Sequence, residues 1–373
     1  MTRDPHDRGA RPAAEARGRA DDGHDADRHE SAEPGTVALR RRRDRHTGLA
    51  SGTGAPGTVG RTEAHISGPR GATEGHPSGP ANGTGARTAN PRPAARTSGL
   101  VNRLDGLGPH DHVCWRYPAP DEFRARVREF LVDGLARNLQ VWYVATGSPA
   151  DLLEDLRGTA ELAAGLRTGA ARVVSLDATY PVGAVLDPAA QVRAYAEATG
   201  AALAEGHAGL RVAADCTPLV RTPEQLAAFA RYENAIDHYM ADRPFSALCA
   251  YSTEVGDAAF GQLACMHPSA NDALPGFRLH AAAGGAAVLG GELDPTNNDL
   301  FALALARSEP HLRDGLLEVD GRTLEFIDHR ALARLSAHAD GLGATVVLRT
   351  SWPGAATLVD LLGLSNIRVE SAA

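Results

Sequence analysis

The chain has 373 residues and a formal net charge of −8, and 43% of its residues are hydrophobic. This length allows two or three domains. All 38 basic side chains are arginines, because the chain contains no lysine. The lack of lysine excludes a Walker A phosphate loop, Schiff-base chemistry and covalent attachment of pyridoxal phosphate.

Residues 1–98 have the composition of a disordered arm. They contain no Phe, Tyr or Trp and are rich in Gly, Pro, Ser, Thr, Ala, Arg and Asp. Such a segment buries too little apolar surface to offset a backbone ordering cost of about 1–2 kcal/mol per residue. It holds 16 arginines against 12 acidic residues, so residues 99–373 carry a net charge of −12. An acidic folded part argues against nucleic-acid binding there, and the arginine cluster at 40–45 is interpreted as solvated.

The cysteine content and the lack of export signals indicate a cytoplasmic protein. The four cysteines are Cys114, Cys216, Cys249 and Cys265, and the first residues lack the apolar core of a signal peptide. No run of about 18 apolar residues is present to span a bilayer. We therefore expect a cytosolic chain with reduced thiols.

Strand-like and helix-like segments alternate between residues 99 and 272. Short apolar runs predict strands at 111–117, 140–145, 172–176, 210–215 and 246–251. Apolar residues at helical spacing predict helices at 120–137, 150–166, 188–206 and 222–240, the last with Thr222 as N-cap. Alternation of this kind is typical of a parallel sheet covered by helices on both faces.

A second, smaller α/β unit is predicted from residue 277 onward. Strands are expected at 277–283 and 286–291, joined by a turn at Gly284-Gly285, and then at 315–320, 326–327, 344–349 and 367–369. Helices are expected at 298–312, 330–341 and 353–362. The predicted fold class is therefore α/β, with a larger parallel sheet, a smaller unit and a preceding disordered arm.

The second unit resembles a STAS domain of the anti-sigma-factor antagonist family over residues 277–371. The resemblance rests on Gly-Glu-Leu-Asp at 291–294, the segments 317–320 and 324–328, and a closing Leu-Leu-Gly-Leu at 361–364. It implies a partner such as an anti-sigma factor, whose kinase activity phosphorylates a serine after the family's Asp. Here Asp328 takes the Asp position, His329 the serine position and Arg330 the next one. Serine phospho-control is therefore expected to be absent, and His329 and Arg330 are read either as a rewritten docking loop or as drifted surface residues.

Residues 105–272 resemble the MEDS sensory domain. The resemblance is carried by Asp-His-Val-Cys at 111–114, the segments 130–135 and 140–144, Arg-Tyr-Glu-Asn at 231–234, the segment 247–251 and Met-His-Pro at 266–268. It implies a RecA-like α/β sheet used for sensing small molecules or for regulatory signalling in bacteria.

Six residues are candidates for ligand binding or sensing: His112, Cys114, Asp215, Glu233, Cys249 and His267. His112-x-Cys114 and Cys265-x-His267 could each offer nitrogen and sulfur to one metal, but the usual zinc-ligand spacings are missing, so no metal or cofactor is assigned.

The remaining candidates have structural alternatives. Cys114 is read as an exposed thiol that could act as a switch. Asp215, at a strand end, could bind a ligand or cap the next turn. Glu233 is expected to form a buried ion pair with Arg211, or else to face solvent.

No catalytic motif is present, since G-x-S-x-G, a G-x-G-x-x-G after a strand and H-E-x-x-H are all missing. We therefore expect a non-catalytic bacterial signalling protein, in which the MEDS-like part senses and the STAS-like part binds an anti-sigma factor or another regulator. The alternative is a small-molecule, redox or metal sensor whose STAS-like part serves as an internal or dimer contact.

Overall fold

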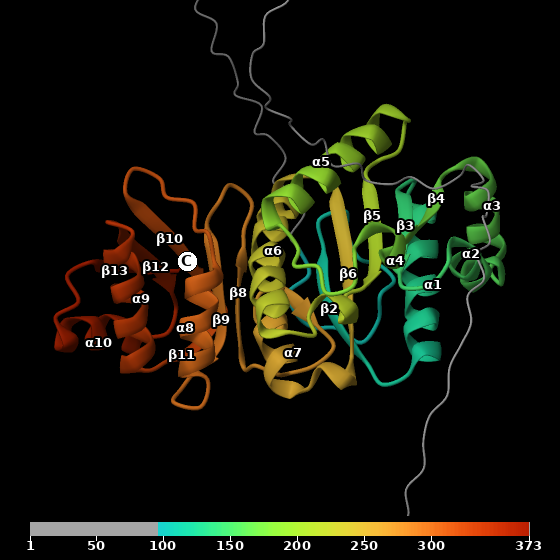
Figure 1. The fold of residues 1–373 in the computed structure, drawn as a ribbon. Coiled ribbons are helices and arrows are strands. Elements are labelled where there is room, and N and C mark those ends of the chain that lie inside the picture. Colours follow the sequence, from blue (N-terminus) through green and yellow to red (C-terminus); the bar gives the residue numbers. More distant parts are fainter. Residues whose placement is uncertain (1–95, 373) are drawn as a thin grey trace, which may run out of the picture. The chain divides into compact units, whose positions relative to one another are not determined.

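The computed structural model describes residues 96–372, which form two β-sheets with helices packed against them (Figure 1). The first sheet has seven strands, all parallel, in the order β1-β7-β2-β6-β5-β3-β4. The second has six strands and is mixed. The predicted α/β class, with a RecA-like parallel sheet and a smaller α/β unit, is confirmed.

The first sheet is built from residues 99–270. Its strands are β1 (Gly99–Leu100), β2 (His112–Tyr117), β3 (Gln140–Ala145), β4 (Ala171–Ser175), β5 (Leu210–Asp215), β6 (Phe245–Ser252) and β7 (Ser269–Ala270). Its α-helices are α1 (Pro120–Ala136), α2 (Pro149–Arg157), α3 (Ala160–Thr168), α4 (Leu176–Thr179), α5 (Pro188–Ala204), α6 (Pro223–Asp242) and α7 (Asp257–Ala264). Two 3-10 turns, η1 (Thr217–Leu219) and η2 (Thr253–Val255), follow β5 and β6.

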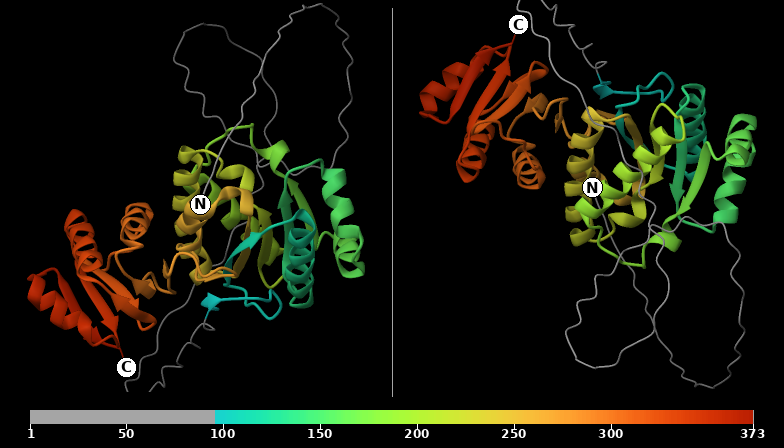
Figure 2. Two further views of the ribbon diagram at one scale, coloured as in Figure 1. Left: turned by 90° about the horizontal axis from the view of Figure 1, so that it is seen from below. Right: turned by 90° about the horizontal axis from the view of Figure 1, so that it is seen from above.

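Alternate residues of the strands enter two separate apolar cores, one on each face of the sheet. Leu210 and Val212 of β5 lie in the core covered by α5, α6 and α7, whereas Ala213 lies in the core covered by α1, α2 and α3. This division follows from the period of two along a strand. Figures 1 and 2 show the helices on both sides of the sheet.

The second sheet is built from residues 277–371. Its strands are β8 (Phe277–Ala281), β9 (Ala287–Leu293), β10 (Leu316–Gly321), β11 (Leu324–Ile327), β12 (Thr345–Thr350) and β13 (Ile367–Ser371), and its helices are α8 (Asn298–Arg307), α9 (His329–Gly341) and α10 (Gly354–Leu362). The path runs β11-β9-β10-β12-β13 with parallel pairing, and β8 pairs antiparallel with β9. The turn at Gly284-Gly285 that joins β8 and β9 has positive φ at both residues, as the sequence predicts for a hairpin.

Most predicted elements are confirmed to within a few residues, although the helix expected at 298–312 ends at Arg307. One predicted helix is wrong, and one helix was missed. The helix expected at 150–166 is two helices, since α2 ends at Arg157 and α3 starts at Ala160, with Gly158 and Thr159 between them. Glycine at this break favours ending the helix. Helix α7 was not predicted, because its eight residues are mostly small and show little amphipathic pattern.

The predicted arm, residues 1–98, lies outside the described residues except for 96–98. These three residues contact the folded part. The backbone N–H and the hydroxyl of Thr97 both donate to the Asp111 carboxylate, at 2.7 and 2.8 Å. The guanidinium of Arg96 pairs with Asp237.

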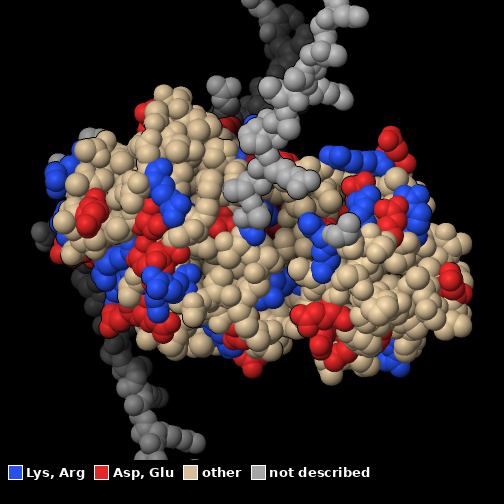
Figure 3. All heavy atoms as spheres, turned by 180° about the vertical axis from the view of Figure 1, so that it is seen from behind, with Lys and Arg blue, Asp and Glu red and all other residues tan. Residues whose placement is uncertain are grey.

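Charged side chains of both signs are mixed on the face shown in Figure 3, where the basic ones are all arginines. Arginines of α1 pair with acids of the same helix, including Arg124 with Asp121 and Arg126 with Glu129. On this face the surface has no single-sign stripe of the kind that grips nucleic acid. None of the helices within residues 96–372 is long and apolar enough to cross a membrane.

Candidate functional site

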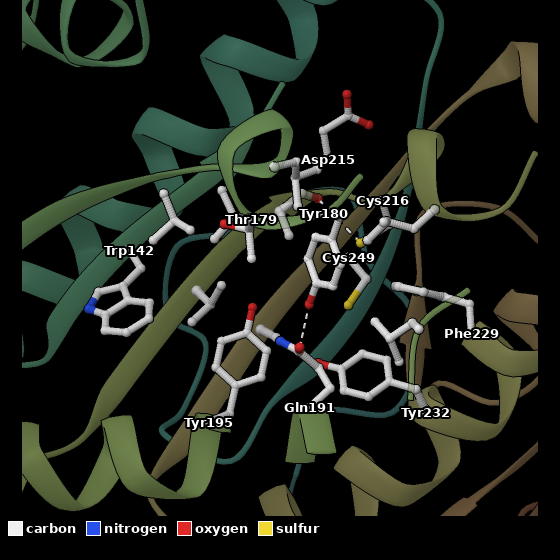
Figure 4. Close-up of a pocket in the computed structure, with 18 of the residues that line it drawn as sticks. Trp142, Thr179, Tyr180, Gln191, Tyr195, Asp215, Cys216, Phe229, Tyr232 and Cys249 are labelled. Carbon is white, nitrogen blue, oxygen red and sulfur yellow. Dashed lines mark hydrogen bonds between the residues drawn. The ribbon is translucent and has the colours of Figure 1, made fainter. Parts of the chain in front are cut away.

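An apolar pocket lies on the α5–α7 face of the first sheet, close to the carboxyl ends of its strands (Figure 4). Trp142 and Val144 of β3 and Val212 of β5 form its floor, and Tyr195 of α5 and Tyr232 of α6 contribute aromatic walls. A few polar groups enter this lining, among them Thr179, Tyr180, Gln191, Cys216 and Cys249. An apolar enclosure with few polar groups is typical of a small-molecule site.

The topology of the sheet explains why the pocket lies here. After β3 the chain passes to α2 on one face, whereas after β5 it passes to α6 on the opposite face. Since β3 and β5 are neighbours, their connections diverge and leave a crevice at their carboxyl ends. Open α/β sheets bind ligands at such a switch point.

Tyr180 and Gln191 form the polar end of this pocket. The Tyr180 hydroxyl donates to Oε1 of Gln191, and both side chains lie beside Tyr195 in Figure 4. Burial raises the pKa of Tyr195 and of Tyr232 well above the usual range, so both hydroxyls stay protonated as neutral donors. The pocket can therefore offer hydrogen bonds without presenting a charge.

Asp215 was predicted either to bind a ligand or to cap a turn, and its contacts are those of a cap. Its Oδ1 accepts the backbone N–H of Thr217 at 3.1 Å and the hydroxyl of Tyr117 at 3.1 Å. Figure 4 shows its carboxylate directed away from the tyrosines of the pocket. Burial raises the pKa of Asp215.

A second feature, the buried cluster, consists of His112, Glu233, Cys249 and His267, and all four side chains are inaccessible to solvent or nearly so. His112 comes from β2, Glu233 from α6, Cys249 from β6 and His267 from the turn between α7 and β7. One ligand-type atom from each lies within 4.8 Å of the others. Four of the six sequence candidates therefore meet in one place.

Glu233 is the centre of the buried cluster. Its Oε2 lies 3.2 Å from His112 Nε2, 3.6 Å from His267 Nε2 and 3.6 Å from Cys249 Sγ. Its other oxygen, Oε1, accepts the hydroxyl of Tyr251. Burial alone would raise the pKa of Glu233, but the two imidazoles and the tyrosine hydroxyl outweigh it and hold that pKa below the usual value.

The two histidines of the buried cluster are in different electrostatic states. Burial opposes a charge on His112, but hydrogen bonds to Asp237 and Glu233 prevail and raise its pKa. Burial and the neighbouring His112 lower the pKa of His267 to about 4, so His267 is neutral at pH 7. Burial raises the pKa of the Cys114 thiol well above 9. The pKa of the Cys249 thiol is also raised well above 9, first by its hydrogen bond with Cys216 and second by burial.

Residues 111–268 match the model of the MEDS family, the methanogen/methylotroph, DcmR sensory domain. This part of the chain, the MEDS region, lies inside the predicted range 105–272. The match indicates a sensory or regulatory role for it, as the sequence predicts. A comparison with curated proteins gives no match to the chain. The family match does not extend to residues 277–371, so their STAS resemblance stays a prediction.

Glu233 of the MEDS region does not pair with Arg211, so that prediction is wrong. Arg211 lies on the opposite face of the sheet, where its guanidinium donates to Asp133 at 2.7 Å and to the Leu107 carbonyl at 2.7 Å. It stacks over the Phe130 ring at 4.6 Å. Residue 211 of β5 points towards α1, whereas α6 covers the other face, so the two side chains cannot meet.

Cys114 is not the exposed thiol that the sequence indicated. It is fully buried on the α6 face of β2, next to Cys249 in the register of the two strands. Cys265, the second thiol of the predicted metal-binding pairs, lies in the core of the second sheet. The two pairs therefore contribute only their histidines to the buried cluster.

Two members of the surrounding network were missed by the sequence analysis. Asp237 lies one helical turn after Glu233, and its Oδ1 contacts His112 Nδ1 at 3.0 Å. Tyr251 lies two residues after Cys249 on the same face of β6. The i, i+4 spacing of two acids on the apolar face of α6 was the available signal for Asp237.

Asp328, His329 and Arg330 lie in the second sheet's unit, at the start of α9. Asp328 is the N-cap, and its Oδ1 accepts the backbone N–H of Ala331 at 2.7 Å. Its Oδ2 accepts a hydrogen bond from Asn298 at 2.9 Å. His329 and Arg330 are the first two helical residues and are exposed to solvent.

Proposed function

We propose that the chain is a regulatory sensor, in which the MEDS region binds a small, largely apolar molecule and the unit at 277–371 binds a regulatory protein. The observation that carries the sensory half is the apolar pocket at the β3–β5 switch point. Its neutral hydroxyl and amide groups, Tyr180, Gln191 and Tyr195, suit a ligand with one hydrogen-bonding group and no charge.

The pocket can be tested by ligand-dependent thermal shift across a set of small organic molecules, with Trp142 fluorescence as a second signal. In Ala214→Leu, a larger side chain enters the pocket from β5. Ala201→Leu is the matched control, because Ala201 is exposed on α5. A ligand that stabilises the parent and the control, but not Ala214→Leu, is expected. Equal stabilisation of all three proteins would place the ligand elsewhere.

The docking half of the proposal rests on the resemblance of residues 277–371 to a STAS domain of the anti-sigma-factor antagonist family. The exposed pair His329 and Arg330 begins α9 and, by this resemblance, corresponds to the docking loop of such domains, with His329 in place of the phosphoacceptor serine. We infer a partner such as an anti-sigma factor, bound without serine phospho-control. No catalytic role is part of this proposal.

The docking half can be tested with the full chain as bait in native lysate, followed by mass spectrometry. Arg330→Glu reverses a charge on the proposed docking loop, and Arg368→Glu, exposed on β13, is the matched control. A regulator that is retained by the parent and the control and lost with Arg330→Glu is expected. Introducing His329→Ser then asks whether an associated kinase phosphorylates the loop. Recovery that is identical for both charge reversals argues against docking at this loop.

A further inference from the structure

We propose that His112, Glu233, Cys249 and His267 of the buried cluster bind one divalent transition-metal ion, with Zn²⁺ as the best match. This site is separate from the proposed ligand pocket in its chemistry, although Cys249 borders both. Its ligand set would be two imidazole nitrogens, one thiolate and one carboxylate oxygen.

The first support is the spacing of the ligand atoms. Zinc binds nitrogen and oxygen at about 2.0–2.1 Å and sulfur at about 2.3 Å, so a tetrahedron has edges of about 3.3 Å between nitrogen or oxygen atoms and about 3.6 Å to sulfur. The cluster has 3.2 Å from His112 Nε2 to Glu233 Oε2, 3.5 Å from Cys249 Sγ to His112 Nε2, and 3.6 Å from Cys249 Sγ to Glu233 Oε2. His267 Nε2 lies 3.6 Å from the same carboxylate oxygen. These four separations are close to tetrahedral edges, and all the ligand atoms lie within 4.8 Å of one another.

The second support is the contact that each imidazole makes through its Nδ1, the ring nitrogen that faces away from the cluster. His112 Nδ1 contacts Asp237 Oδ1 at 3.0 Å, and His267 Nδ1 contacts the carbonyl oxygen of Leu263 at 2.9 Å. Since both partners are acceptors, each Nδ1 would keep its proton when an ion is bound, and each Nε2 would then direct a lone pair at the ion. Metal-binding histidines commonly have a carboxylate or a backbone carbonyl in this position.

The third support is an unsatisfied polar atom. His267 Nε2 is fully buried and has no hydrogen-bond partner among residues 96–372. Buried nitrogens without partners are rare in folded proteins and call for an explanation. An ion at the centre of the cluster would satisfy this nitrogen and the other three ligand atoms together.

The charges around the cluster also suit a divalent ion. Glu233 and a Cys249 thiolate would bring two negative charges, which Zn²⁺ neutralises while both histidines stay neutral. Tyr251 donates to Oε1 of Glu233, which leaves Oε2 for the ion. The remaining acid, Asp237, is already paired with Arg96. Nothing in this buried shell would be left with an unpaired charge.

A metal-free alternative is a buried ion pair between protonated His112 and Glu233. It accounts for the contact of these two residues. It also accommodates Cys249, whose thiol donates to Glu233 Oε2 at 3.6 Å, but it leaves His267 Nε2 facing a carboxylate without a bond. We therefore favour the metal site, and the two readings differ in measurable metal content.

The experiment uses the full chain, kept reduced and loaded with Zn²⁺ or Co²⁺, then dialysed against a weak chelator. We expect about one ion per chain by elemental analysis. The Co²⁺ form should show the visible absorption of a tetrahedral site and a thiolate-to-cobalt charge-transfer band in the near ultraviolet. Removal of the ion with a strong chelator should lower the melting temperature, and re-addition should restore it.

Variants are needed to locate the ion, because residues 1–95, which lie outside the described residues, also contain histidines. Glu233→Gln and Cys249→Ser preserve side-chain size, and each should lower retained metal at least tenfold. Cys216→Ser and Cys265→Ser change buried thiols outside the cluster and should retain about one ion.

The proposal is overturned if the folded parent retains less than a tenth of an ion per chain after loading with either metal. It is equally overturned if folded Glu233→Gln and Cys249→Ser retain metal as the parent does. If both variants fail to fold, the charge-transfer band of the Co²⁺-loaded parent decides, because the histidines of the arm cannot produce a thiolate band.

Discussion

The imidazole rings of His112 and His267 lie with their centroids 4.0 Å apart, although one belongs to the first long strand of the sheet and the other to the turn before its last strand. Strand β7 pairs with β2 in parallel, and this pairing brings the two rings together. Glu233 approaches both from α6, which crosses the same face. With Cys249 of β6, the buried cluster therefore depends on four segments that are separate in the sequence.

Replacing Glu233 by alanine is expected to destabilise the fold by about 3–5 kcal/mol, because His112, Tyr251 and Cys249 lose their shared partner inside the core. Urea unfolding of the full chain, followed by circular dichroism, measures the loss. Glu224→Ala, on the exposed first turn of the same helix, should cost less than about 1 kcal/mol. Similar losses for both variants would contradict the central role of Glu233.

Arg211→Lys is expected to cost about 3 kcal/mol, although the charge is kept. The guanidinium makes bonds in several directions at once, to Asp133, to the carbonyls of Leu107, Gly108 and Phe130, and to Ser246. A lysine ammonium cannot reproduce this fork. Arg221→Lys, at an exposed position, should be near neutral. An unchanged unfolding midpoint for Arg211→Lys would mean that the network adds little.

Gly134 of α1 makes room for this arginine. A Cβ at position 134 would lie 2.8 Å from Cδ of Arg211 and 2.9 Å from Cγ1 of Val141. Gly134→Ala is therefore expected to cost about 1–3 kcal/mol through overpacking, despite the better helix propensity of alanine. The same unfolding assay measures it. A stabilised Gly134→Ala protein would show that the arginine can shift at little cost.

His280 of β8 is expected to make the fold sensitive to acid. Burial lowers its pKa to about 4, against about 6.5 in an unfolded chain. Between pH 6.5 and pH 4, His280 takes up a proton in the unfolded state but not in the folded state. The free energy of unfolding therefore decreases as the pH falls through this range. The loss from this group is about 2 kcal/mol between pH 7 and pH 5.

The variant His280→Gln removes this proton uptake. Between pH 7 and pH 5 its free energy of unfolding should therefore fall by about 2 kcal/mol less than that of the parent. Unfolding curves at pH 7 and pH 5 for parent and variant measure the difference. His329→Gln, at an exposed position, is the control and should follow the parent. Parallel pH profiles for parent and His280→Gln would refute this account of His280.

Asp328 is expected to matter as a helix cap rather than as a charge. Asp328→Ala removes the bond to the Ala331 N–H and the one from Asn298, and should cost about 1–2 kcal/mol. Asp328→Asn keeps an oxygen for the cap and should cost clearly less. Thermal unfolding of the two variants makes the comparison. Equal melting temperatures would mean that the cap does not limit stability.

The sequence by itself determined the order and kind of most elements. Short apolar runs alternating with amphipathic segments indicated a parallel sheet, and Thr222 with Gln225 forms the capping box that starts α6 where Thr222 was expected. These features are local, since they depend on the period of side chains and on the bonding of helix ends. The break between α2 and α3 was missed because the apolar pattern continues across it.

The grouping of side chains was decided by the tertiary structure. The sequence singled out His112, Cys114, Glu233, Cys249 and His267, but it paired Glu233 with Arg211 and histidines with the wrong cysteines. Which residues meet depends on strand order and on the face that each helix covers, and neither is encoded by local periodicity. The α6 face of the sheet collects Glu233, both histidines and Cys249, and the opposite face takes Arg211, because adjacent residues of a strand point in opposite directions.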